Sequence, residues 1–225
     1  MKKQEKSQNS IPEDLKDSKC QICGGTEWIL SEDENGCIQA KPCKCQEYNR
    51  MSRRLSFANI PESFKSNRME NFSLSVYKSI ESRNTASIAC KEIKTYMDNF
   101  KTAKEEGLGL YLYSHTKGSG KTRMAASIAN RLVTEYPVKF AVSSEILNEI
   151  KSTYDKAAEI SESKLLDDLI TTEILFIDDF GMDNGSKWVN DKYYHIINER
   201  YIAKKVTFFT SNESVENLKY DDRIL

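Results

Sequence analysis

The chain has 225 residues, 39% of them hydrophobic and 30% charged, with a formal net charge of −1. No apolar run approaches the ~20 residues of a membrane span, and the polar N-terminus is no secretory signal, so we expect a cytoplasmic protein without a membrane partner. The near-zero net charge neither favours nor excludes a nucleic-acid partner.

The N-terminal part of the chain divides into a polar leader and a cysteine-rich module. Residues 1–18 are polar and mixed in charge, which predicts a disordered leader. Residues 19–56 hold five of the six cysteines and end in a basic stretch. The basic residues fit a surface for nucleic acid or an acidic partner as well as a solvated helix face; they are Lys41, Lys44, Arg50, Arg53 and Arg54.

Four of these cysteines form two close pairs, Cys20 with Cys23 and Cys43 with Cys45. Each pair supplies two thiolates from one tight turn, as a tetrahedral Zn²⁺ site requires. Disulfides or redox-active thiols are the less favoured alternatives for an intracellular chain, and Cys37 could replace one ligand. A module this short needs the metal for much of its folding free energy.

A connector and a helix come next, over residues 57–106. Apolar residues at helical spacing predict a helix from Arg83 to Lys104, ended by Gly107. Cys90 lies on this helix and is interpreted as an ordinary buried residue.

From residue 107 onward, strands alternate with helices. Apolar runs predict strands at residues 108–113, 138–142, 173–179 and 206–212, and helical patterns lie between them, over 121–136, up to 170 and over 187–204. Strands whose apolar runs are nearly continuous, and that alternate with helices, indicate a parallel sheet covered on both faces. The predicted class is therefore α/β.

The loop after the first of these strands reads SHTKGSGKT and resembles the phosphate-binding pattern G-x4-G-K-[ST], except that His115 occupies the first glycine position. Its glycines allow the backbone N–H groups to surround a phosphate, and the following helix directs its positive end there. Lys121 would reach the β- and γ-phosphates, and the Thr122 hydroxyl would bind Mg²⁺. We expect ATP to contact Thr116, Lys117, Gly118, Ser119, Gly120, Lys121, Thr122 and Arg123.

Polar side chains end the third and fourth strands. Asp178 would hold Mg²⁺, and Asp179 would orient or deprotonate the attacking water. Asn212 would sense the γ-phosphate or that water. The alternatives are a helix cap for the two aspartates and a turn residue for Asn212. The predicted catalytic residues are Lys121, Asp179 and Asn212.

Taken together, the segments CQICGGTEWI, PCKC, IPESFKSNRMENF, LYLYSHTKGSGKT, ILFIDDFG, INERY and TFFTSN resemble the AAA+ helicase loaders of bacteria and their phages, the DnaC/DnaI group. The resemblance implies an AAA+ P-loop NTPase core over residues 107–225, with strand order 5-1-4-3-2. It also implies that the zinc module over residues 19–56 binds a ring helicase, that the core binds ATP and single-stranded DNA, and that copies self-assemble.

The resemblance also implies a missing fifth strand. Arg223 matches the first arginine of the family's pair, and the arginine finger would lie beyond Leu225. Hydrolysis is then expected to be slow and to depend on a neighbouring subunit, while Arg200 in the INERY helix receives no catalytic role. The alternative functions are a transposition ATPase of the IstB type and a nucleotide-binding adaptor that does not hydrolyse ATP.

Overall fold

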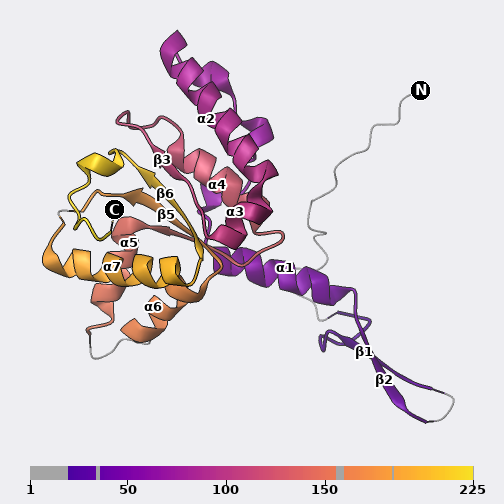
Figure 1. The fold of residues 1–225 in the computed structure, drawn as a ribbon. Coiled ribbons are helices and arrows are strands. Elements are labelled where there is room, and N and C mark those ends of the chain that lie inside the picture. The colour runs from indigo at the N-terminus through magenta and orange to yellow at the C-terminus, as the bar shows by residue number, and fades with distance from the viewer. Residues whose placement is uncertain (1–19, 34–35, 156–159, 184, 225) are drawn as a thin grey trace, which may run out of the picture. The chain divides into compact units, whose positions relative to one another are not determined.

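The computed structural model describes residues 20–33, 36–155, 160–183 and 185–224, so the predicted leader lies outside the described residues. The chain forms two compact units, Met1–Arg53 and Arg54–Leu225, and the division falls inside helix α1, Cys45–Ala58 (Figure 1). None of the helices in the described ranges is long and apolar enough to cross a membrane.

The first unit contains an antiparallel hairpin of strands β1, Trp28–Glu32, and β2, Ile38–Pro42. Every residue of both strands is exposed. Trp28 lies opposite Pro42, and Leu30 lies opposite Ala40. Because directly opposed residues point to the same side, one face of the hairpin is apolar.

The second unit begins with a connector of short 3-10 turns and two helices. The turns are η2 (Glu62–Phe64), η3 (Met69–Asn71) and η4 (Leu74–Val76), and the helices are α2 (Ile80–Asp98) and α3 (Phe100–Glu106). The single helix predicted from Arg83 to Lys104 is therefore wrong in two respects, since it starts earlier and breaks at Asn99. Asn99 leaves helical geometry while its side-chain amide donates to the Thr95 carbonyl, a local hydrogen bond that competes with the helix.

The core sheet has parallel strands in the order β3-β6-β5-β4. Their bounds are β3 Tyr111–Tyr113, β4 Val138–Val142, β5 Ile174–Phe180 and β6 Val206–Ser211. If the four core strands are numbered 1 to 4 along the chain, this order is 1-4-3-2. For the strands that the described residues contain, it agrees with the predicted order 5-1-4-3-2.

Helices cover both faces of this sheet (Figure 1). Ile174 and Phe176 pack into a cluster with α2, α3 and α4 (Lys121–Leu132). Leu175 and Ile177 point the other way, into a cluster with α5 (Ser143–Ser152), α6 (Glu162–Thr171) and α7 (Lys187–Ile202). This alternation explains why the first four residues of β5 are all apolar. A short turn, η5 (Val215–Asn217), follows β6.

Burial also explains the role of Arg200 on α7. Its guanidinium is fully buried and donates to the carbonyls of Leu169, Thr172 and Val206 at 2.6–2.7 Å. Burial lowers the pKa of Arg200 to about 9. The side chain ties α7 to the end of α6 and the start of β6, so its role is structural.

Candidate functional site

The phosphate-binding loop joins the end of β3 to the start of α4. Gly118 and Gly120 have φ angles of 72° and 93°, which side chains rarely adopt. His115 is not among the described residues with positive φ, so the first glycine position needs no glycine here. A Cβ added at Gly120 would lie 3.0 Å from the Tyr77 hydroxyl and 3.3 Å from the Phe72 ring, a tight fit that adds to the preference of its positive φ for glycine.

Lys121 extends its ammonium across this loop. Nζ donates to the Ser114 carbonyl at 3.1 Å and to Asn212 Oδ1 at 2.9 Å. Burial lowers the pKa of Lys121, and the charges of Asp179 and Asp178 oppose that shift. The ammonium therefore lies between the loop, the carboxylates at the end of β5 and the amide at the end of β6.

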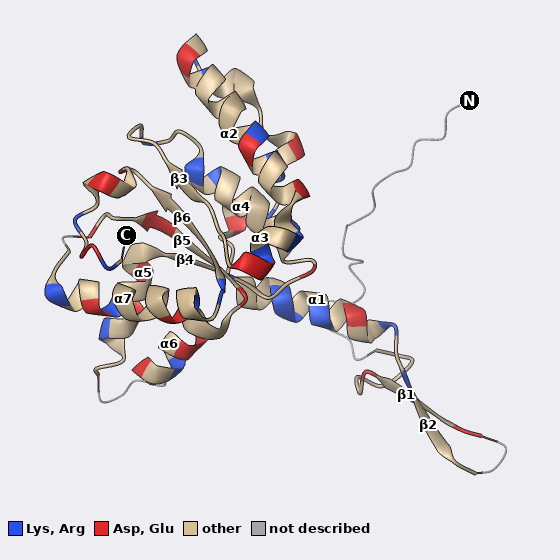
Figure 2. Cartoon of the chain, viewed as in Figure 1, with Lys and Arg blue, Asp and Glu red and all other residues tan. Residues whose placement is uncertain are grey.

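Asp178 and Thr122 form the second part of the site. Thr122 Oγ1 donates to Asp178 Oδ1 at 3.0 Å, and Asp178 is 6% exposed. Burial raises the pKa of Asp178, while hydrogen bonds from Thr210 and Thr122 lower it. Two adjacent hard oxygen ligands, a hydroxyl and a carboxylate, fit the preference of Mg²⁺. Figure 2 shows acidic residues at the end of β5. The neighbouring strands β3 and β6 carry no charged residue, so β5 alone of these three strands brings charge to this edge of the sheet.

Asn212 connects three segments at the edge of the sheet. Its Oδ1 accepts from Lys121, and its Nδ2 lies 3.3 Å from the Met182 sulfur. Its main-chain oxygen lies 3.0 Å from His115 Nδ1, so that nitrogen is the donor. The structure thus brings the predicted residues Lys121 and Asn212 together. Met182 is not among the predicted site residues, because its contact with Asn212 has no local sequence signal.

A cleft of about 990 Å³ adjoins the loop. Its walls come from the connector and α2 on one side and from β3 and the loop on the other, and include Tyr77, Ser82, Thr85, Tyr113, Thr116 and Lys117. The Tyr77 hydroxyl donates to the Ser119 carbonyl at 2.6 Å, so the connector holds the loop directly. Nothing in the sequence pattern indicated this contact.

Arg123, the third residue of α4, contacts the connector. Its Nη2 donates to the Asn71 carbonyl at 3.0 Å, and its guanidinium lies 5.5 Å from the centre of the Phe72 ring. These contacts fix the connector against α4. The expected contact of Arg123 with ATP stays a prediction.

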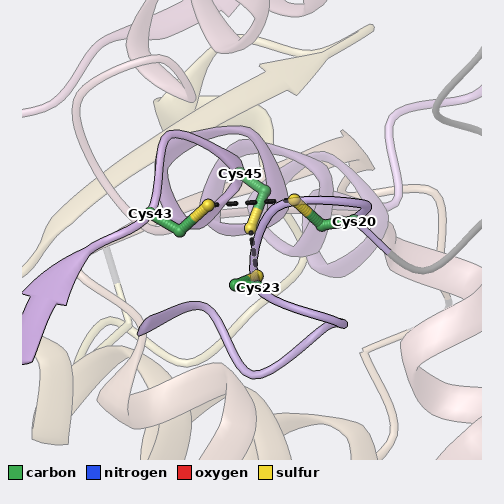
Figure 3. A group of neighbouring side chains, drawn as sticks. All are labelled: Cys20, Cys23, Cys43 and Cys45. Atoms are coloured by element: carbon green, nitrogen blue, oxygen red, sulfur yellow. Dashed lines mark hydrogen bonds between the residues drawn. The ribbon is translucent and has the colours of Figure 1, made fainter. Parts of the chain in front are cut away.

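The four predicted zinc ligands come together in the first unit (Figure 3). The sulfurs lie within 4.8 Å of one another, with 3.8 Å between Cys20 and Cys43 and 3.4 Å between Cys23 and Cys45. A tetrahedral site with Zn–S bonds of ~2.3 Å places its sulfurs about 3.8 Å apart, so the four thiols fit zinc. Cys37 lies outside this group.

The thiols differ in their tendency to ionise. Burial alone would raise the pKa of Cys23, but hydrogen bonds from Cys45 and from the backbone at Gly25 and Glu27 lower it to about 6. Burial and the neighbouring thiols raise the pKa of Cys45. Four thiols at this spacing cannot all ionise unless a cation neutralises them, which is what a bound Zn²⁺ would do.

Two arginines of the basic stretch make contacts inside their own units. Arg53 pairs with Glu27 in the first unit, and Arg54 Nη1 donates to the Thr134 carbonyl at 3.0 Å in the second. Figure 2 shows several basic segments along α1 with an acidic interruption, which is Glu47.

A surface cluster that was not predicted from the sequence joins the C-terminal end of α5, with the turn after it, to α7. Trp188 Nε1 donates to the Tyr154 hydroxyl at 3.2 Å, and Tyr154 is 56% exposed. The amines of Lys151 and Lys192 lie 5.3 and 5.9 Å from the Trp188 ring. We call Tyr154, Trp188, Lys151 and Lys192 the aromatic-basic cluster. Its members are far apart in sequence, so no local motif announces it.

Solved structures with a similar fold include the DnaC helicase loader, with a TM-score of 0.53 and 23% identity over 69% of this chain and 82% of that one. AMPPCP-bound DnaA from Aquifex aeolicus has a TM-score of 0.57 and 18% identity over 74% of this chain and 47% of that one. These likenesses concern the fold alone.

Curated relatives include the replicative helicase loader DnaI of Bacillus subtilis, 36% identical over 118 residues, which are 51% of this chain and 36% of that protein. The loader DnaC of Buchnera aphidicola from Acyrthosiphon pisum is 26% identical over 130 residues, 57% of this chain and 51% of that protein. The chain thus spans about half of these relatives' length, or less. The family model for IstB-like ATP binding proteins matches residues 43–222, and the chain belongs to that family.

Proposed function

We propose that this protein is an ATP-controlled loader that delivers a ring helicase onto single-stranded DNA. The observation that carries the proposal is the convergence of Lys121, Asp178 and Asn212 at one edge of an AAA+ sheet. Relatives named replicative helicase loader supply the biological role.

In this proposal the backbone of residues 116–120 surrounds the phosphates of ATP, and Lys121 binds the β- and γ-phosphates. Thr122 and Asp178 hold Mg²⁺, which would neutralise charge on the phosphates. Asp179 orients or deprotonates the attacking water, and Asn212 senses the terminal phosphate through its amide. The cleft beside Tyr77 receives the nucleoside.

Hydrolysis in this proposal is slow and needs an arginine from a neighbouring copy. Arg223 is held by an ion pair with Asp221, and its guanidinium lies 4.8 Å from the centre of the Tyr194 ring. Because Arg223 is already paired within its own subunit, the proposal assigns the role of the arginine finger to another residue of the neighbouring copy.

The aromatic-basic cluster is the proposed surface for single-stranded DNA. Aromatic rings offer stacking platforms for unpaired bases, and nearby amines attract the phosphates. Tyr154 and Trp188 supply the rings, while Lys151 and Lys192 supply the positive charge. Glu162 pairs with Lys192 and so reduces its contribution to that charge.

The first unit is the proposed helicase-binding module. The apolar face of its hairpin carries Trp28, Leu30, Ile38, Ala40 and Pro42, all of them exposed. A two-stranded hairpin with no buried residue is marginally stable alone, so the neighbouring zinc site would give it a fixed base.

The decisive experiment is co-purification of the protein with a replicative helicase, with and without ATP. The proposal expects helicase to be retained and ATP to change the amount retained. Lys121→Ala is the control, because it should keep helicase binding and lose the ATP effect. Retention of a transposase instead of the helicase would favour the IstB-type alternative. Equal single-turnover hydrolysis by the parent protein and Lys121→Ala would favour the adaptor.

A further inference from the structure

The two aspartates at the end of β5 lie in a bulge of the sheet. Ile177 pairs with Phe209, and Phe180 pairs with Ser211, so Asp178 and Asp179 together oppose the single residue Thr210. A bulge of this kind redirects side chains and is frequent beside active sites. Here it brings two consecutive carboxylate-bearing residues to the edge where the phosphate-binding loop lies.

Thr210 contacts both aspartates through one hydroxyl. Its Oγ1 donates to Asp178 Oδ1 at 2.5 Å and accepts from the backbone N–H of Asp179 at 3.0 Å. The side chain is 2% exposed, so water cannot easily replace these bonds. A hydroxyl has only one hydrogen to donate, so the O–H bond of Thr210 points toward the Asp178 carboxylate.

The same carboxylate oxygen also accepts from Thr122, at 3.0 Å. Two threonine hydroxyls, one from β6 and one from α4, therefore fix the rotation of the Asp178 side chain. A carboxylate held from two sides is ordered before any ligand binds. That ordering reduces the entropy lost on binding.

Asp179 has a φ angle of 54°, in the left-handed region that favours glycine. Such a conformation costs on the order of 1 kcal/mol in a residue with a side chain. The bond from its N–H to Thr210 is one of the contacts that hold it there.

We propose that Thr210 is a positioning residue of the nucleotide site, which orients Asp178 toward Mg²⁺ and holds the backbone of Asp179. This inference rests on the proposed ATP site. Thr210 itself touches neither nucleotide nor metal in this role. It acts through the carboxylate of Asp178 and the backbone of Asp179.

The test compares Thr210→Val, which keeps the shape and removes the hydroxyl, with Thr210→Ser, which keeps the hydroxyl. Thr172→Val is the matched control. Thr172 lies just before the opposite end of β5, and the substitution removes a buried hydroxyl that donates to the Asp168 carbonyl. The main readout is binding of a fluorescent ATP analogue, first in EDTA and then during titration with Mg²⁺. Thermal unfolding of each variant is followed in parallel.

Thr210→Val should raise the Mg²⁺ concentration for half-maximal tightening about 10-fold, while affinity in EDTA changes less than about 2-fold. Thr210→Ser should restore the Mg²⁺ response to within about 3-fold of the parent, and Thr172→Val should match the parent. A Val variant with the parent's Mg²⁺ response overturns the inference. So does an equal loss in EDTA and in Mg²⁺, or a Ser variant that behaves like Val.

Failure of the proposed function gives a different pattern. If the parent protein binds the analogue neither in EDTA nor in Mg²⁺, the ATP site itself is refuted, and this inference falls with it. If the parent shows a normal Mg²⁺ response and Thr210→Val does too, only the role of Thr210 is refuted.

Discussion

The side-chain oxygen of Asn212 lies 2.9 Å from the ammonium of Lys121. Lysine can only donate, so this contact fixes which end of the amide faces the loop. The amide nitrogen then points toward Met182, two residues after the end of β5. A single side chain thus connects the phosphate-binding loop, β5 and β6.

Replacement of Asn212 by alanine should slow ATP hydrolysis more than it weakens binding. Loss of one polar group that acts in the reaction lowers the rate by about 10- to 100-fold, while affinity should change less than about 3-fold. Single-turnover hydrolysis and equilibrium nucleotide binding measure the two effects. Asn217→Ala, an exposed asparagine five residues further on, is the control. Equal rates for Asn212→Ala and the parent would show that Asn212 is only a turn residue.

Metal analysis should find about one zinc per chain. Cys43→Ser should lose the metal and unfold the first unit, because the other three thiols cannot complete the tetrahedron. Cys37→Ser is the control and should keep the zinc. Nucleotide binding should survive in both variants, since the nucleotide site lies in the second unit. A folded first unit without metal would contradict the zinc site.

Trp188→Ala should weaken binding of single-stranded DNA about 10-fold, because stacking contributes about 1–3 kcal/mol per base. Fluorescence anisotropy of a labelled oligonucleotide at two salt concentrations gives the affinity and the charge contribution. Tyr201→Ala is the matched control, since Tyr201 is 81% exposed on the same helix but lies outside the aromatic-basic cluster. If both variants weaken binding equally, the proposed DNA surface is wrong.

Arg200→Met should lower the free energy of unfolding by about 3 kcal/mol, because several buried carbonyls lose a charged donor. Denaturant titration of the second unit's fluorescence measures the loss. Arg131→Met is the control, since Arg131 pairs with Glu135 on the surface and should cost less than about 1 kcal/mol. A small effect at Arg200 would mean that the carbonyls find other donors.

The sequence predicted the α/β fold class because apolar runs mark buried parallel strands. The strand order followed from the family resemblance and not from the apolar runs. Cys20, Cys23, Cys43 and Cys45 were predicted as one group because two short pairs suffice to suggest it. In the structure these four thiols do come together.

Features that depend on contacts between distant segments could not be predicted from local sequence patterns. The bulge opposite Thr210 follows from the register between β5 and β6. The aromatic-basic cluster follows from the contacts that Lys151 and Tyr154 make with Trp188 of α7. The break at Asn99 was missed because the apolar spacing continues across it, and only the side-chain bond to Thr95 reveals the end of the helix.

The left-handed backbone of Asp179 has a consequence for attempts to stabilise the protein. Glycine at this position would relieve the strain and is the replacement that a search for heat resistance would favour. The same replacement deletes the carboxylate proposed to act on water. Substitutions at position 179 that raise thermal stability should therefore lower the rate of ATP hydrolysis.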